Sequence, residues 1–113
     1  MMEPAHEALR REMLEETGLS VSVGRLIWIV ENFLQLRGTA FHEVGLYFEM
    51  SMETGALPDG KTFTGREGEK SLEFRWATFE ELPELRLLPD FLTNGLSSLP
   101  VTTERIVWID RAI

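Results

Sequence analysis

The chain has 113 residues, 43% of them hydrophobic, which is enough for one small core but hardly for two. Its net charge of −8 argues against nonspecific binding to nucleic-acid phosphates, because like charges repel. It has no cysteine, so neither disulfides nor thiolate zinc sites can form. It also has no apolar run long enough to span a membrane and no apolar core of a signal peptide. We therefore expect a single cytoplasmic domain.

The first predicted element is a short helix that stops at Gly18. Glycine commonly follows the last residue of a helix, because it adopts the left-handed conformation without steric cost. The apolar positions that recur with helical spacing are Ala5, Ala8, Leu9 and Met13. We therefore expect an amphipathic helix, with Gly18 as its structural turn.

Three glutamates share one face of this predicted helix. Glu12, Glu15 and Glu16 stand at i, i+3 and i+4, within an arc of roughly 100°. Like charges at this spacing disfavour a helix, and the helix dipole opposes negative charge in its last turn. A locally unfavourable cluster is expected where function requires it, and Mg²⁺ and Mn²⁺ select oxygen ligands. The pattern therefore predicts a site for a divalent cation.

A helical projection places Glu12 and Glu16 within the apolar stripe, so we expect both side chains to face inward. A buried carboxylate needs a partner, and Arg10 and Arg11 point mostly to other sectors of the helix. A metal or a more distant base would then compensate the charge. The alternative is that the glutamates form a solvated acidic face, which is common in helices of this composition.

Two extended runs follow the helix. Residues 21–30 and 41–50 are rich in β-branched and aromatic side chains, which favour strands. Residues 37–39 between them read Arg-Gly-Thr, a turn signal. We therefore expect two adjacent antiparallel strands.

The remaining chain alternates turns with short elements. Glycines, prolines and charges predict a loop over residues 55–70, and alternating apolar and polar residues predict a strand over residues 71–77. Thr78 and Glu81 have the spacing of a helix capping box. Residues 105–110 are predicted as a final strand.

The segment from Glu3 to Leu19 resembles the signature of the Nudix hydrolases, G-x(5)-E-x(7)-R-E-U-x-E-E-x-G-U, where U is a bulky aliphatic residue. Seven residues separate Glu3 from the run REMLEETGL, which supplies every later specified position. The resemblance implies a Nudix-type α/β/α sandwich around a mixed central sheet. It also implies Mg²⁺- or Mn²⁺-dependent hydrolysis of a nucleoside diphosphate linked to another moiety, such as ADP-ribose or a nucleoside triphosphate.

The resemblance also implies roles for the residues of this box. Glu12 and Glu16 would be the primary metal ligands, and Glu15 would be a further ligand or would position the attacking water. Glu15 and Glu16 are thereby the catalytic candidates of the helix. Glu3 and Arg11 would orient this cluster from outside it.

Nudix enzymes often take an additional metal ligand or a catalytic base from a loop at about the position of residues 65–70. By this resemblance Glu69 is the first candidate here, and Glu67 is nearly as good. Glu73 is the third candidate in this stretch. The alternative is that all three are solvated loop glutamates.

The opening glycine of the signature would stand six residues before Glu3, whereas the sequence starts two residues before it. We therefore expect a Nudix domain over residues 1–113 that lacks the strands before the box. Such a domain would expose an unpaired sheet edge, which predicts self-association, for example as a homodimer. It would also hydrolyse its substrate less well than a domain with those strands.

Two other classes of function stay open. A non-catalytic nucleotide or metabolite-binding module on the same scaffold would bind a ligand without releasing phosphate. An inactive domain whose acidic helix binds no metal would keep the same thermal stability when Mg²⁺ or Mn²⁺ is added. The NADH-directed subgroup carries the run S-Q-P-W-P-F-P after the box, and its absence here removes that substrate without favouring another.

Overall fold

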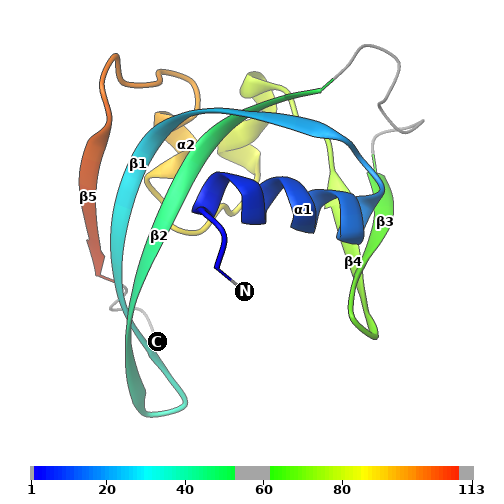
Figure 1. The fold of residues 1–113 in the computed structure, drawn as a ribbon. Coiled ribbons are helices and arrows are strands. Elements are labelled where there is room, and N and C mark those ends of the chain that lie inside the picture. The colour runs from blue at the N-terminus through cyan, green and yellow to red at the C-terminus, as the bar shows by residue number, and fades with distance from the viewer. Residues whose placement is uncertain (1, 53–61, 110–113) are drawn as a thin grey trace. The chain divides into compact units, whose positions relative to one another are not determined.

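The computed structural model describes residues 2–52 and 62–109. Its strands form two sheets, a three-stranded sheet in the order β2-β1-β5 and the hairpin β3-β4 (Figure 1). The elements in chain order are α1 (Ala5–Thr17), β1 (Val21–Leu36), β2 (Thr39–Met52), β3 (Thr62–Glu67), β4 (Lys70–Arg75), the 3-10 helix η1 (Phe79–Glu84), α2 (Leu92–Gly95) and β5 (Glu104–Ile109).

Contacts divide the chain into two compact units. The first unit comprises Met1–Gly24 and Met50–Glu81, and the second comprises Arg25–Glu49 and Leu82–Ile113. Helix α1 and the hairpin β3-β4 belong to the first unit, while β5 and most of β1 and β2 belong to the second.

Helix α1 begins after Pro4 and ends at Gly18, which confirms the predicted helix and its stop. The carbonyl oxygen of Pro4 accepts the N–H groups of Glu7 and Ala8 at 3.0 and 3.1 Å. Gly18 lies in the left-handed region at φ 76°, and its N–H donates to the Leu14 carbonyl oxygen at 2.9 Å. A side chain at this φ would be strained, so the glycine allows the chain to leave the helix and enter β1.

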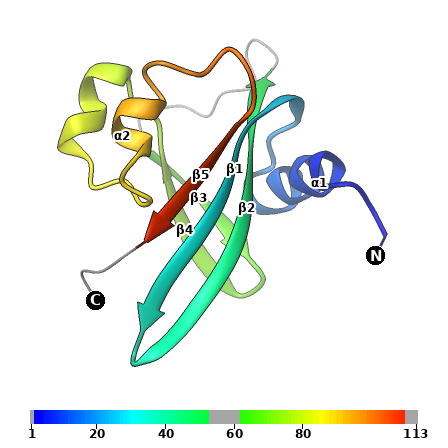
Figure 2. The same cartoon turned by 90° about the vertical axis from the view of Figure 1, so that its left-hand side faces the viewer.

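The three-stranded sheet is mixed. Strands β1 and β2 are joined by Arg37 and Gly38, both at positive φ, and a two-residue turn of this kind joins antiparallel neighbours. Strand β5 pairs with β1 in parallel (Figure 2). Val30 of β1 lies opposite Ile106 of β5. The predicted neighbours and the predicted final strand are confirmed, except that Asp110 lies outside the described residues. The fold is therefore of the α/β class, as predicted.

The core of the second unit forms around Trp28. Ile27, Trp28 and Val30 are buried, and the Trp28 ring meets Phe91 edge to face with centroids 5.2 Å apart. Burying a large apolar side chain contributes about 1.5–3 kcal/mol. The side chains packed against this cluster are Tyr47, Phe91, Leu92, Leu96, Ile106 and Trp108.

The hairpin β3-β4 corrects one sequence prediction. Residues 62–67, predicted as part of a loop, form strand β3, while residues 53–61 lie outside the described residues. Ring stacking explains the difference, because Phe63 lies 5.1 Å from Phe74 and 5.7 Å from Trp76 between ring centroids. The strand predicted over residues 71–77 is confirmed as β4, although it ends at Arg75.

The predicted capping box starts the 3-10 helix η1. Both the backbone N–H and the hydroxyl of Thr78 donate to Glu81 Oε1, at 3.0 and 3.2 Å. Arg75 Nη2 donates to the other oxygen of Glu81 at 3.1 Å. These bonds connect the end of β4 to the helix that follows it. No helix in the described part of the chain is long and apolar enough to cross a membrane.

Candidate functional site

An open cavity of about 530 Å³ lies in the first unit, between α1 and the tip of the β3-β4 hairpin. The three helix glutamates selected from the sequence all line it, together with residues from the hairpin. Its lining consists of Arg11, Glu12, Glu15, Glu16, Arg66, Glu67 and Gly68. The fold therefore brings two acidic segments that lie far apart in the sequence to one cavity.

Gly65 permits this arrangement. It is buried in β3, and a Cβ atom there would lie 2.5 Å from Phe74 Cε2 and would also collide with the carbonyl oxygen of Glu16. The β3 backbone thus packs directly on the last turn of α1, at a distance that only glycine allows. Sequence reasoning missed this role, although a glycine among strand-forming residues signals a close backbone approach.

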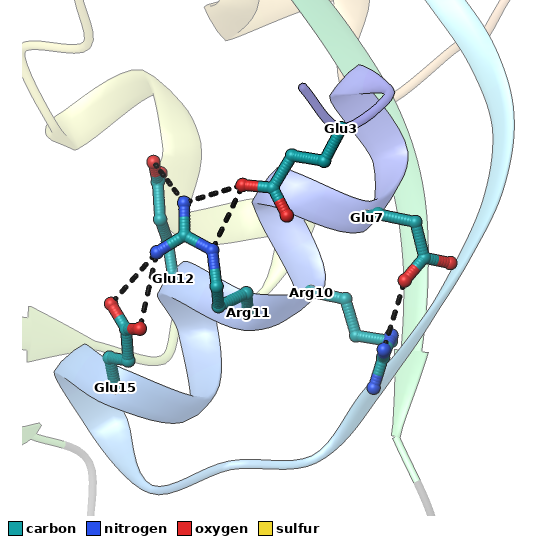
Figure 3. A network of polar contacts seen from close by, with 6 residues as sticks. All are labelled: Glu3, Glu7, Arg10, Arg11, Glu12 and Glu15. Atoms are coloured by element: carbon teal, nitrogen blue, oxygen red, sulfur yellow. Dashed lines mark hydrogen bonds and ion pairs between the residues drawn. The ribbon is translucent and has the colours of Figure 1, made fainter. Parts of the chain in front are cut away.

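Arg11 is the centre of an ion-pair network on α1 (Figure 3). Its Nε and Nη2 atoms donate to Glu3 Oε1 at 2.9 and 2.7 Å, and its Nη1 donates to both oxygens of Glu15 at 3.1 Å. The Glu12 carboxylate is more distant, at 3.9 Å from Nη2. Hydrogen bonding to Glu3, and then to Glu15, raises the pKa of the Arg11 guanidinium above its ordinary value. The network therefore links the segment before the helix to the cavity.

The network distinguishes the three helix glutamates from one another. Both oxygens of Glu15 accept hydrogen bonds from Arg11. Glu12 makes only the long contact to Arg11, and Glu16 has no hydrogen bond or ion pair to any residue within 2–52 and 62–109. Glu12 and Glu16 thus retain the oxygen lone pairs that a cation would need.

The expected inward orientation of the acidic face is wrong for Glu12. Its side chain is 53% exposed, and Glu16 is only partly buried. No residue of α1 is buried, and the face that carries Glu12, Glu15 and Glu16 borders an open cavity. The carboxylates therefore face a wet cavity, where a charged group costs far less than in an apolar interior.

The donor set around the cavity suits a hard divalent cation. Four carboxylates outnumber two guanidinium groups in the lining, and carboxylate oxygens are the preferred ligands of Mg²⁺ and Mn²⁺. As the side chains stand, no three histidine, aspartate or glutamate residues of the described ranges converge closely enough to hold a metal ion. The donor chemistry therefore fits, and binding would require carboxylates to turn toward one another.

The hairpin glutamates occupy different positions. Glu67 lines the cavity, whereas the first candidate from the sequence, Glu69, and the third, Glu73, are exposed and do not belong to its lining. Glu67 is the last residue of β3 and pairs with Lys70 across the turn. The geometry thus favours Glu67 as the fourth acidic group, and a role for Glu69 stays a prediction.

The chain matches a known protein family. The family model described as NUDIX domain matches residues 2–94, which is most of the chain and includes every residue that lines the cavity. No curated protein matches the chain.

Proposed function

We propose that this chain, which belongs to the Nudix family, is a Mg²⁺- or Mn²⁺-dependent hydrolase that cleaves a diphosphate bond in a nucleoside diphosphate linked to another moiety. Membership of the family supports hydrolase activity at the family level. The observation that carries the finer proposal is the cavity in which Glu12, Glu15 and Glu16 face Glu67. ADP-ribose and nucleoside triphosphates are the substrates to test first.

The contacts around the cavity suggest different catalytic roles for its carboxylates. Glu12 and Glu16 would hold the cation, because Arg11 leaves their oxygens largely unengaged. The bound cation would neutralise diphosphate charge and activate water. Glu15, held by Arg11, would position that water, and Glu67 would accept its proton from the hairpin side of the cavity. Glu69 is the alternative base.

A substitution at Arg11 gives the first test of these roles. We expect Arg11→Lys to lower kcat about tenfold. A lysine ammonium is a point charge and lacks the planar set of N–H donors with which the Arg11 guanidinium binds Glu3 and Glu15 at the same time. Steady-state kinetics of nucleotide product formation, followed by chromatography, measure the effect. The matched control is Arg10→Lys, since Arg10 pairs with Glu7 on the same helix and does not line the cavity. Equal kcat values for the two variants would contradict an orienting role of Arg11.

Metal binding is testable without a substrate. A ligand that binds only the folded state stabilises it by about 2.7 kcal/mol at a hundred times Kd, so Mn²⁺ is expected to raise the melting temperature by several degrees. The rise should vanish in the double variant Glu12→Gln, Glu16→Gln. The matched control is Glu7→Gln, Glu84→Gln, which removes the same charge at two residues that do not line the cavity. Equal shifts in both double variants would show that Mn²⁺ binds elsewhere on this acidic chain.

One observation favours a second candidate function. Because no three acidic groups of the described ranges converge as they stand, the same cavity also suits a module that binds a nucleotide or metabolite without hydrolysing it. Such a module would bind ADP-ribose or a nucleoside triphosphate in the presence of Mg²⁺ and form no nucleoside monophosphate. Chromatographic analysis of the nucleotide products, run beside a binding titration, separates the two functions.

A further inference from the structure

Two guanidinium groups line the cavity, and only one of them is hydrogen-bonded to carboxylates of the described residues. Arg11 is held by Glu3 and Glu15. Arg66, on the hairpin side, has no hydrogen bond or ion pair to any residue that the structure describes, although it shares the cavity with four carboxylates. All of its N–H donors are therefore available to a ligand in the cavity.

The backbone of Arg66 is fixed in place. Arg66 pairs with Ser71 in the antiparallel ladder, one residue before the Glu67–Lys70 pair that closes the hairpin. The preceding residue, Gly65, packs against the last turn of α1. A side chain that extends from such a fixed position loses less freedom on binding than one on a free loop.

The chemistry of this side chain suits a phosphoryl group. A planar guanidinium offers parallel N–H groups that match two oxygens of one phosphate, and such charge-assisted bonds are stronger than neutral ones. The carboxylates in the same cavity repel an anion, so a diphosphate needs positive charge on its protein side as well as a cation. Arg66 is the group in the described lining that supplies this charge.

We propose that Arg66 binds the diphosphate of the substrate and orients it toward the carboxylates of α1. The inference rests on the proposed function, because it assigns the residue that recognises the phosphoryl group in the same cavity. Arg66 thereby contributes to substrate affinity, while Glu12 and Glu16 hold the cation.

The test uses methylenediphosphonate, a diphosphate analogue that cannot be hydrolysed and carries no nucleoside. Isothermal titration calorimetry in the presence of Mg²⁺ should show that Arg66→Gln raises its Kd about tenfold or more, since a hydrogen bond to a charged group contributes ~1.5–3 kcal/mol. The Kd of Arg66→Lys should lie between those of Arg66→Gln and the unmodified protein, because lysine keeps the positive charge but lacks the planar N–H donors of the guanidinium group. Arg10→Gln is the matched control, with the same change of charge on α1 outside the cavity.

The outcomes separate this inference from the proposed function. Unchanged affinity in Arg66→Gln, with analogue binding by the unmodified protein, overturns the role of Arg66 and leaves the hydrolase proposal standing. An equal loss in Arg10→Gln also overturns it, because the effect would then reflect net charge alone. If the unmodified protein does not bind the analogue with Mg²⁺, the role of Arg66 in binding the diphosphate is overturned, whereas the hydrolase proposal is decided by product formation from the nucleotide substrates. The Mn²⁺-induced rise in melting temperature should persist in Arg66→Gln, and its loss would show that Arg66 acts through the metal site instead of the diphosphate.

Discussion

Glu16→Gln is expected to lower Mg²⁺-dependent hydrolysis about a hundredfold or more while leaving the fold intact. Glu16 lines the cavity, and its carboxylate has no partner in the described ranges, so its charge is free to bind the cation. The substitution also removes a negative charge from the last turn of α1, beside Glu12 and Glu15. The metal-free variant should therefore melt at the same temperature as the unmodified protein, or slightly higher.

The measurement is chromatographic quantification of the nucleotide products formed from ADP-ribose, dinucleoside polyphosphates and nucleoside triphosphates at equal Mg²⁺. Glu7→Gln is the control, because Glu7 lies on the same helix, pairs with Arg10 and does not line the cavity. If Glu16→Gln retains most of the activity of the unmodified protein, the carboxylate of Glu16 does not hold the catalytic cation.

Gly65→Ala is expected to lower the free energy of unfolding by about 1–3 kcal/mol and to reduce hydrolysis at least about tenfold. The new methyl group would collide with the Glu16 carbonyl oxygen and the Phe74 ring, so β3 and the last turn of α1 must separate. That separation moves Glu67 away from the helix carboxylates. The stability effect is measured by urea unfolding, and activity is measured at a temperature where the variant is fully folded.

Gly45→Ala is the matched control for this substitution. Gly45 is also a strand glycine, but the nearest atom to an added methyl group is Tyr47 Cε1, at 3.1 Å, and the next two are also side-chain atoms, at 3.8 and 3.9 Å. It should therefore cost less stability than Gly65→Ala and leave hydrolysis unchanged. If both variants lose the same stability and activity, the contact between β3 and α1 does not position the site.

Local sequence signals were sufficient for the elements whose causes are local. The helical spacing of apolar residues and the left-handed glycine at position 18 predict α1 and its end, and both are confirmed. The Arg37-Gly38 turn predicts the pairing of β1 with β2. The spacing between Glu3 and the glutamates of α1 indicates the family, which the match over residues 2–94 confirms.

The missed features depend on contacts between distant residues. The stacking of Phe63 on Phe74 makes β3 a strand despite the glycines and charges around it. The choice between Glu67 and Glu69 depends on which one faces α1 from the hairpin, and spacing along the chain does not contain that information. Helical projection placed Glu12 inside with the apolar stripe, whereas its side chain is 53% exposed and lines an open cavity.

The contact between Gly65 and the last turn of α1 also bears on how the cavity assembles during folding. Gly65 and Glu16 are 49 positions apart (65 minus 16), so the chain must close a long loop before Glu67 and the helix carboxylates share one space. Loop closure costs entropy, and each doubling of the loop adds about 0.6 kcal/mol. Helix α1 can form from neighbouring residues within microseconds, whereas the cavity must wait for this non-local closure. The cavity therefore depends on the docking of β3 against α1, and it can form no earlier than that non-local contact.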